Sequence, residues 1–484
     1  MNLIFCKKFV SVILLTAGFL GGCGSSDVPA AENTEKTDET VPAVQKESTE
    51  EPSETSTEPE IHLHIDGRTN YMELMIEQFK EEHPEVTVHT TDYSDLWPAD
   101  YHAKLASQMM TGEGPDVLMI INTGNDTFDT FPSLIKMIQS DVFMDINDLE
   151  IDLSGCNEKV MKAGIYEDKQ VLLPLNYSLG FLYTTKERLA EAGISYYDGI
   201  TLEEFSAGFP AFYENNPEKK AFLNYLTGQD LFPLSSISFV DYTAGELIDS
   251  AENIEKMERL TRSFDNLFPR IFESGDRALS YMFYRNLKNY GSVDRDIYQS
   301  GDLLFMSGRG FTGAYDCILM YNNYIYPEDI AKGETPVLFP MPTVTGEMPS
   351  PNVTYYIAVN AKTKNTDAVR KFLETAIGED LQYHSVGAGI PVNNAIMEHM
   401  EESYLTPGYD PSDPHLFPQT CEYDREFVES YFYYIDNMKD ALPYMDRTTV
   451  GYLFTIIRNN LRGEATVEEG FADAESQVKF YLSE

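Results

Sequence analysis

Hydrophobic and polar residues follow two different periods between residues 61 and 121. Residues 61–65 alternate between apolar and polar side chains, which predicts a half-buried β-strand. Large apolar side chains then recur at helical spacing over residues 72–79, and Pro84 ends this pattern because proline disfavours helix in the residue before it. A second strand, a second helix and a continuously apolar strand follow at residues 86–88, 101–109 and 117–121. This order of elements predicts a doubly wound α/β lobe.

The polar segments that follow the three predicted strands are the first candidates for a binding site. In doubly wound sheets, ligands bind beyond the carboxyl ends of parallel strands. The corresponding segments here are residues 66–70, 92–97 and 122–125. We therefore expect these residues to form the rim of a ligand site.

The N-terminus has the pattern of an export signal. Lys7 and Lys8 precede an apolar stretch, residues 9–20, that is too short to span a bilayer as a mature helix. Small residues then lead directly to Cys23, and this sequence resembles the lipobox of bacterial lipoproteins. The resemblance implies that residues 1–22 are removed as a signal peptide and that the Cys23 sulfur carries a lipid. The alternative is an ordinary signal peptide with an incidental cysteine.

The segment after Cys23 lacks the large apolar residues that a core needs. Residues 24–60 are mainly Glu, Thr, Ser, Pro and Ala, so burial cannot offset the entropy of ordering them. We expect residues 23–60 to be a lipidated, disordered and acidic tether on the extracytoplasmic face of the cell membrane. The chain of 484 residues is longer than one core usually supports, which predicts two lobes in the remainder.

The net charge of −44 at pH 7 restricts the partners of the chain. Such a charge repels phosphate backbones and anionic lipid surfaces, so we expect no nucleic acid and no membrane contact except through the lipid anchor. After export, Cys156, Cys317 and Cys421 form an odd and widely spaced set. This set predicts neither a disulfide framework nor a zinc site built on cysteines, and whether any two of them pair stays open.

A series of short segments resembles the family 1 extracellular solute-binding proteins of ABC importers. The segments lie at residues 79–88, 104–105, 110–117, 173–175, 180–186, 192–194, 201–205, 300–308, 357–360, 368–373, 389–392 and 463–469. One of them also carries an independent helix signal, because Thr201 and Glu204 fit a capping box. The shared order and spacing of the segments, which span nearly all of residues 61–484, carry the resemblance.

The resemblance implies an α/β fold of the type II periplasmic-binding-protein-like kind. In this fold two α/β lobes are joined by hinge crossings, and the ligand lies in the cleft between them. We place the crossings near residues 172–174 and 340–351, although the second stretch also suits a proline-rich surface loop. The expected N-terminal lobe comprises residues 61–173 and about 300–345, and the expected C-terminal lobe comprises residues 174–299 and about 346–484.

The resemblance also implies a monomer without a cofactor that delivers a small-molecule ligand, an oligosaccharide or other sugar, to the permease subunits of an ABC transporter. The sequence contains no catalytic HExxH, GxSxG or Walker motif and no Cys/His zinc spacing, so we expect no enzyme. A secreted glycoside hydrolase stays an alternative, because two of 79 acidic residues can meet at a catalytic separation. A surface binding or adhesion lipoprotein without a transport role is another.

Three histidines raise the question of a metal site. His62 and His64 point to one face of the first predicted strand, and His89 lies on a strand that is a candidate neighbour. Metal ligation and a solvated strand face both fit this pattern. The solvated face is the favoured interpretation, because no further ligand cluster accompanies the histidines in the sequence.

The candidate ligand-binding residues combine aromatic rings with polar groups near predicted strand ends. Aromatic rings stack on the apolar faces of sugars, whereas amides and guanidinium groups bind hydroxyls. The candidates are Asn70, Trp97, Asn122, Tyr177, Arg309, Phe311 and Tyr355. Each aromatic also fits a core or surface position, since Tyr and Phe are abundant throughout the chain.

Residues 308–311 depart from the pattern of sugar-binding members of the family. Those members often place a tryptophan just after the glycine of this segment, whereas this chain has Arg309 and then Phe311. Phe311 can take the stacking role, or Arg309 can clamp an acidic group such as a uronate carboxylate. The departure weakens the assignment to carbohydrate.

Overall fold

The computed structural model describes residues 59–65, 70–92, 98–122, 133–222, 235–248, 250–269, 293–307, 325–384, 389–405 and 423–483. The chain divides into two units, Met1–Ser56 and Thr57–Glu484, and all of these residues lie in the second. The predicted signal peptide, Cys23 and nearly all of the predicted tether lie outside the described residues. Every helix in the described ranges is too short or too polar to cross a bilayer.

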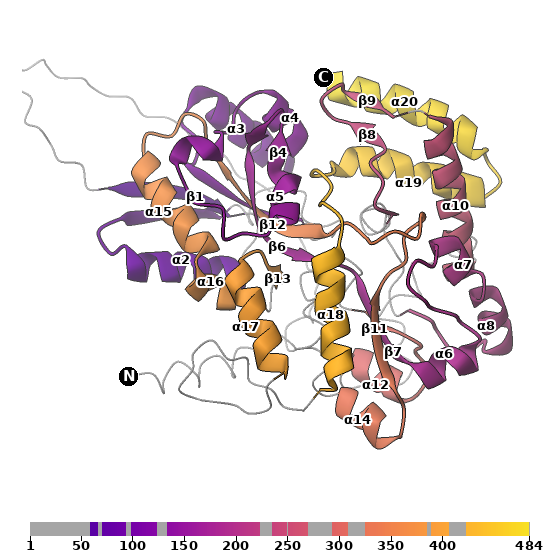
Figure 1. The fold of residues 1–484 in the computed structure, drawn as a ribbon. Helices are drawn as coiled ribbons and strands as arrows, with labels where there is room; N and C mark the ends of the chain where they lie inside the picture. The colour runs from indigo at the N-terminus through magenta and orange to yellow at the C-terminus, as the bar shows by residue number, and fades with distance from the viewer. Residues whose placement is uncertain are drawn as a thin grey trace, which may run out of the picture. The chain divides into compact units, whose positions relative to one another are not determined.

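A six-stranded sheet is built on the predicted strand and helix pattern. β1 (Glu60–Ile65) pairs in parallel with β2 (Thr87–Asp92) and β3 (Val117–Ile121), and α2 (Asn70–Glu82) and α3 (Pro98–Thr111) lie between them in the sequence (Figure 1). The predicted order of strands and helices is therefore confirmed. β1 begins at Glu60, which is the last residue of the predicted tether.

Three later strands, β6, β12 and β13, complete this sheet, whose order is β13-β6-β12-β3-β1-β2. β12 (Asn352–Val359) lies antiparallel between β3 and β6 (Leu172–Ser178), and β13 (Ile390–Pro391) pairs antiparallel with β6 at the edge. Because two antiparallel pairings separate β6 from β3, β6 runs in the same direction as β1, β2 and β3. The carboxyl ends of these four parallel strands therefore share one edge of the sheet.

A three-stranded antiparallel sheet lies next along the chain. Its order is β10 (Met306–Ser307), β7 (Phe181–Thr185) and β11 (Pro336–Pro340). The chain passes from the first sheet to the second directly after β6 and returns between β11 and β12. These two connections are neighbours, because the Met341 N–H donates to the Gly180 carbonyl at 3.0 Å.

The two connections lie near the predicted crossings, at residues 179–180 and 341–351. β10 and β11 pair with β7, whereas the family resemblance implies that residues about 300–345 belong to the N-terminal lobe. The extent of each lobe stays a prediction.

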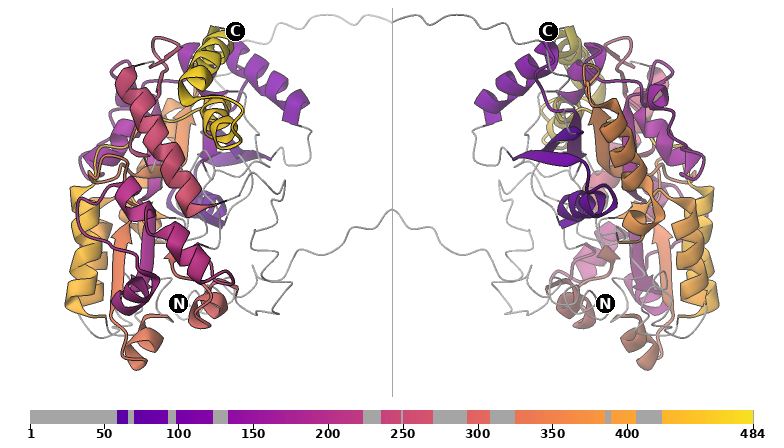
Figure 2. Two further views of the ribbon diagram at one scale, coloured as in Figure 1. Left: turned by 90° about the vertical axis from the view of Figure 1, so that its right-hand side faces the viewer. Right: turned by 90° about the vertical axis from the view of Figure 1, so that its left-hand side faces the viewer.

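Helices and short hairpins surround the sheets. The further helices are α4 (Leu134–Gln139), α5 (Glu158–Met161), α6 (Lys186–Ala192), α7 (Leu202–Ser206), α8 (Phe209–Asn215), α10 (Ala251–Leu267), α12 (Val293–Gln299), α14 (Tyr326–Ala331), α15 (Thr366–Ile377), α16 (Glu379–His384), α17 (Asn394–Leu405), α18 (Arg425–Asn437), α19 (Arg447–Leu461) and α20 (Val467–Ser483). The short elements are η1 (Ile146–Leu149), η2 (Lys162–Gly164), β4 (Ile165–Tyr166), β5 (Lys169–Gln170), β8 (Val240–Asp241) and β9 (Glu246–Leu247). α15 packs against α2 and β1, α18 packs against β11, and α10, α19 and α20 pack together (Figures 1 and 2).

Local hydrogen bonds confirm the predicted capping box. The Thr201 hydroxyl accepts a hydrogen bond from the Glu204 N–H, and the Glu204 carboxylate accepts one from the Thr201 N–H at 3.0 Å. This capping box begins α7. Gly463 adopts a left-handed conformation, with φ 69°, in the turn between α19 and α20.

Candidate functional site

The carboxyl edge of the six-stranded sheet is the candidate site. β1, β2, β3 and β6 all end there, so their outgoing segments meet at one place. Such an edge is where α/β sheets bind ligands. Of the predicted rim, the structure describes Asn70, Asp92 and Asn122, and the rest of residues 66–70, 92–97 and 122–125 lies outside the described ranges.

Asn122 follows β3 and holds it to β12. Its backbone N–H donates to the Thr354 carbonyl at 2.8 Å, and its side-chain Nδ2 donates to the Val353 carbonyl at 2.9 Å. Asn122 also lines a small pocket of about 20 Å³ with Tyr356 and Tyr444. That volume admits about one water molecule, and not a sugar ring. Asn122 is therefore at the predicted edge, with its amide nitrogen engaged by the backbone of β12.

Tyr177 lies near the end of β6 and is fully buried, with no exposed surface. It pairs with Val353 on β12 and with Ile390 on β13. Burial raises the pKa of the Tyr177 hydroxyl, and the nearby Asp436 carboxylate raises it further. The hydroxyl has no hydrogen-bond partner in the described part of the chain. A buried hydroxyl without a hydrogen-bond partner lowers the stability of the fold by about 1–3 kcal/mol. The Tyr177 hydroxyl is therefore either a local source of instability or a group that binds a ligand.

Tyr355 comes from the middle of β12, opposite Ile121 on β3 and Asn176 on β6. It is buried, and its ring meets the ring of Tyr71 on α2 edge to face, with centroids 5.1 Å apart. The fold thus brings Asn122, Tyr177 and Tyr355 to the same end of three neighbouring strands. In this structure the rings of both tyrosines are packed into the protein body.

The structure describes no side chain of the remaining predicted site residues. The backbone of Asn70 begins α2, directly after the β1 edge segment. Trp97, Arg309, Phe311 and the lipidation residue Cys23 lie outside the described residues.

Ser178 is an edge residue that the sequence interpretation missed. It ends β6 opposite Asn352, is 1% exposed, and its hydroxyl has no hydrogen-bond partner among the described residues. Side chains alternate along a strand, so Ser178 faces the side of the sheet opposite Tyr177. The signal in the sequence is the pair of polar residues Asn176 and Ser178, which interrupts an apolar strand just before Gly180.

A buried charged network lies behind the second sheet. The Tyr183 and Tyr298 hydroxyls donate to Oδ2 of Asp329 at 2.9 and 3.2 Å. The Arg188 guanidinium lies 3.0 Å from Glu334 and 3.5 Å from Asp329, and stacks over the Tyr298 ring at 3.9 Å. Burial raises the pKa of Asp329. Because arginine and hydroxyls occupy these carboxylates, the network is suited to structural support more than to acid–base chemistry.

A pocket of about 220 Å³ adjoins this network. Arg188, Lys219 and Lys332 line it together with Glu191 and Glu334, so its charges largely offset one another. Its volume is below the roughly 300–1,000 Å³ of typical small-molecule sites. The carboxyl edge of the first sheet is the better candidate because of its place in the fold, since ligands of α/β sheets bind beyond the carboxyl ends of parallel strands.

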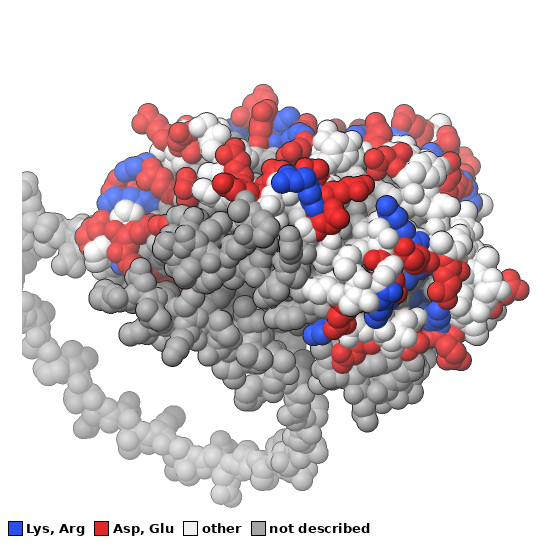
Figure 3. Space-filling model, turned by 60° about the horizontal axis from the view of Figure 1, so that its bottom comes forward, with Lys and Arg blue, Asp and Glu red and all other residues white. Residues whose placement is uncertain are grey.

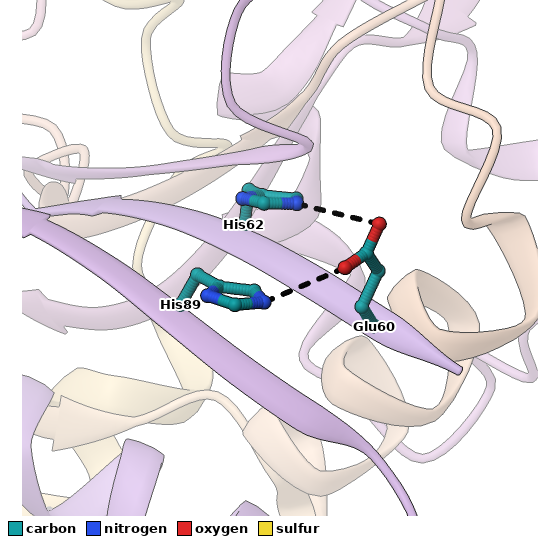
Figure 4. Close-up of side chains that lie close together, drawn as sticks. All are labelled: Glu60, His62 and His89. Carbon is teal, nitrogen blue, oxygen red and sulfur yellow. Dashed lines mark ion pairs between the residues drawn. The ribbon is translucent and has the colours of Figure 1, made fainter. Parts of the chain in front are cut away.

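Two of the three histidines, His62 and His89, lie next to Glu60, a residue that the sequence interpretation missed. His62 Nε2 lies 3.7 Å from the Glu60 carboxylate and His89 Nε2 lies 3.4 Å from it (Figure 4). His64, by contrast, is buried, with 1% of its surface exposed. The sequence does not single out Glu60, because this residue precedes the alternating run and is one of many acidic residues at the end of the predicted tether.

Cys156 is a free thiol in the core. It is 5% exposed, and burial raises its pKa to about 11. The other two cysteines of the predicted set, Cys317 and Cys421, lie outside the described residues.

Acidic side chains are spread over the surface of the described residues, with basic side chains between them, on the face drawn in Figure 3. The distribution agrees with the net charge of −44.

Comparisons with known proteins place this fold. The chain is similar to a periplasmic-binding protein of Synechococcus sp. MITs9220, with 16% identity, TM-score 0.58, and 87% of this chain and 99% of that one covered. It is similar to an oligogalacturonide-binding protein of Yersinia enterocolitica, with 15% identity, TM-score 0.55, and 88% and 99% covered. It is also similar to the GacH receptor of Streptomyces glaucescens, solved with acarbose, with 14% identity, TM-score 0.52, and 88% and 98% covered.

The predicted fold class is confirmed by these similarities, because the neighbours share the type II periplasmic-binding-protein-like fold. Comparison with curated protein sequences finds no match. Residues 65–383 match the family described as bacterial extracellular solute-binding protein. That match covers more than half of the chain and agrees with the family resemblance of the sequence segments. The chain therefore belongs to the bacterial extracellular solute-binding protein family.

Proposed function

We propose that this protein is a lipid-anchored receptor on the extracytoplasmic face of the cell membrane. It captures an oligosaccharide or other small sugar and delivers it to the permease subunits of an ABC transporter. Cys23 carries the lipid, and residues 23–60 act as the tether. The protein acts as a monomer, uses no cofactor for capture, and returns its ligand chemically unchanged.

The observation that carries this proposal is the pair of neighbouring connections between the two sheets. Residues 179–180 and 341–351 run side by side, joined by the Met341–Gly180 hydrogen bond of 3.0 Å. Gly180 has φ 67°, a conformation that residues with a side chain rarely adopt. Two adjacent crossings of this kind allow two lobes to open and close around a ligand with few changes in backbone angle.

The proposed ligand contacts lie near the carboxyl edge and on the returning segment. They are Asn70, Trp97, Asn122, Tyr177, Arg309, Phe311 and Tyr355, and we add Ser178. The uncompensated hydroxyls of Tyr177 and Ser178 support a polar ligand at this edge, because a ligand hydroxyl would satisfy either of them. Both are buried in this structure, so opening of the lobes has to precede contact.

A sugar that carries carboxylates is the preferred ligand class. Arg309 stands where sugar-binding members of the family often have a stacking tryptophan, and a guanidinium fork suits a uronate carboxylate. The similarity to the oligogalacturonide-binding protein of Yersinia enterocolitica is consistent with this choice. Neutral maltose-like oligosaccharides are the comparison class.

The test is a thermal-shift titration of the full chain with neutral oligosaccharides, oligouronates, peptides and inorganic anions. A ligand at a hundredfold its dissociation constant adds about 2.7 kcal/mol to the free energy of unfolding. We expect stabilisation by an oligosaccharide, and recovery of that oligosaccharide intact after prolonged incubation. Stabilisation by peptides alone overturns the sugar assignment, and sustained hydrolysis of a glycoside supports the hydrolase. No response to any soluble ligand favours the adhesion lipoprotein.

A further inference from the structure

Glu60, His62 and His89 rise from one face at the edge of the six-stranded sheet. Glu60 and His62 are two residues apart on β1, so their side chains lie on the same face. His89 on β2 is the register partner of His62, which places the two imidazoles side by side. The fold therefore gathers one carboxylate and two imidazoles that the sequence separates by up to 29 positions.

The distances among these groups are close to those between ligands of a metal ion. Glu60 lies 3.7 Å from His62 Nε2 through Oε1 and 3.4 Å from His89 Nε2 through Oε2, and all three ligand atoms lie within 4.8 Å of one another. Zinc bonds of about 2.0–2.2 Å in a tetrahedron separate neighbouring ligand atoms by about 3.3–3.5 Å. Figure 4 shows both Nε2 atoms directed toward the carboxylate.

A small rotation of the imidazole side chains is needed for both to bind one metal ion. The two imidazole rings are stacked, with centroids 4.5 Å apart and planes 10° apart, whereas a shared metal requires the rings to tilt toward each other. The three side chains are 46–49% exposed, so rotation about their side-chain bonds meets little resistance. The backbone is held in place, because the His62 N–H donates to the buried Asp116 carboxylate at 2.7 Å.

We propose that Glu60, His62 and His89 bind one Zn²⁺ ion, with water at the remaining coordination position. Two imidazoles and a carboxylate are a donor set typical of zinc, whereas calcium and magnesium prefer oxygen donors alone. The ion bridges β1 to β2, which is an edge strand of the sheet. The ion therefore stabilises the pairing of β1 with β2, the first two strands of the folded chain.

The zinc site is separate from the proposed ligand edge. Glu60 and His62 lie at the amino end of β1, whereas the candidate ligand site lies beyond its carboxyl end. A strand of six residues spans roughly 20 Å, so neither site reaches the other directly. Zinc is therefore expected to change the stability of the protein without changing the affinity for its solute.

The experiment uses the full chain without a histidine-containing tag, stripped of metal, and titrated with Zn²⁺ against a chromophoric chelator. We expect one ion per chain. His62→Gln and His89→Gln are each expected to weaken binding at least about tenfold, a loss typical even of removing a group that supports a metal ligand. His83→Gln is the matched control, because His83 lies 3.6 Å from Glu85 in a pair without a second imidazole.

A second readout identifies the ligands directly. With Co²⁺ in place of zinc, the wild-type protein is expected to show the visible bands of a low-coordinate nitrogen and oxygen site, and both histidine variants are expected to lose them. Equal melting temperatures of all variants in chelator show that folding is intact. Equal zinc affinity in the His62→Gln, His89→Gln double variant, a thiolate-to-cobalt absorption band, or no binding at micromolar Zn²⁺ each overturns the proposal.

Discussion

The Tyr183 hydroxyl donates a 2.9 Å hydrogen bond to Oδ2 of Asp329, a carboxylate whose side chain has no exposed surface. Tyr183 lies on β7 and Asp329 on α14, so this bond fixes a helix to the centre of the second sheet. Arg188 approaches the same carboxylate from α6 at 3.5 Å. One buried acid thus joins three elements.

Asp329→Ala is expected to destabilise the fold by about 3–5 kcal/mol, because it leaves the largely buried Arg188 with one partner fewer and two tyrosine hydroxyls without an acceptor. Lys332→Ala is the control: Lys332 lies 3.6 Å from the same carboxylate but is 41% exposed, so a change of about 0–1 kcal/mol is expected. Urea denaturation measures both. Equal effects of the two substitutions would show that the carboxylate is not supporting the buried network.

Tyr177→Phe removes a buried hydroxyl that lacks a partner in the described residues. We expect the free energy of unfolding to rise, by up to about 1–3 kcal/mol, because the desolvation penalty of the hydroxyl disappears and the ring keeps its packing. Tyr177→Ala is expected to destabilise by about 3–5 kcal/mol through the cavity it leaves. Thermal and urea unfolding test the pair, and a loss of stability in the Phe variant contradicts the assignment of an unsatisfied hydroxyl.

Substitutions of the proposed ligand contacts are expected to lower the affinity for the solute without lowering the melting temperature. Trp97→Ala and Phe311→Ala are each expected to weaken solute binding by about 1–3 kcal/mol if the rings stack on a sugar, with little change in melting temperature. Ser178→Ala is expected to weaken binding less, as the loss of one hydrogen bond. Calorimetric titration and melting curves are compared for each variant. Wild-type affinity together with lowered melting temperatures identifies core residues and refutes the proposed contacts.

Ligand is expected to close the protein. A solute that touches both lobes favours the closed form by its difference in affinity for the two forms, and the crossings at residues 179–180 and 341–351 supply the hinge. Small-angle scattering should give a smaller radius of gyration at saturating ligand than without it. A scattering profile that ligand leaves unchanged argues against the hinged cleft.

Cys156 is expected to resist alkylation in the folded protein. Its pKa of about 11 keeps the thiol protonated at pH 8 and lowers the thiolate fraction by roughly a hundredfold relative to an exposed cysteine. The reactive fraction therefore rises as the pH approaches 11, and burial slows the reaction further. Mass spectrometry of iodoacetamide-labelled peptides, with and without denaturant, measures this protection. Rapid labelling of native protein at pH 8 would contradict it.

Cys23→Ala is expected to release the protein from the membrane fraction or to block its processing. Because Cys23 lies in the predicted tether, ligand affinity should stay at the wild-type value. Membrane fractionation and immunoblotting follow the protein, with Cys156→Ser as a cysteine control outside the lipobox. A Cys23→Ala protein that is still processed and still sediments with membranes excludes the lipobox interpretation.

The local part of the fold was predictable from side-chain periodicity. β1, β3 and α2 lie where alternation, continuous hydrophobicity and helical spacing predict them, because each pattern reports burial within a single element. The insertion of β12 between β3 and β6 was not predictable in this way. Its pairing depends on contacts such as Asn122 with Val353, 231 residues apart, which leave no local pattern.

The candidate site residues were predictable where a local pattern places them, and not where only strand pairing brings them together. Asn122 was predictable because it directly follows a clear strand, and the alternation in residues 61–65 placed His62 on a strand face. Glu60 was missed, because only the pairing of β1 with β2 brings it to His89. Ser178 was missed because the polar pair Asn176 and Ser178 carries little information until the burial of both residues is known.

The position of β12 also governs when the sheet can assemble. β3 and β6 pair with β12 and not with each other, and β12 begins only at Asn352. A nascent chain shorter than that leaves the edges of β3 and β6 that face β12 unpaired, and such non-local pairings fold slowly. The protein is therefore expected to stay in a loose, protease-sensitive state until about three quarters of its length has been made, and any truncation before β12 invites edge-to-edge aggregation.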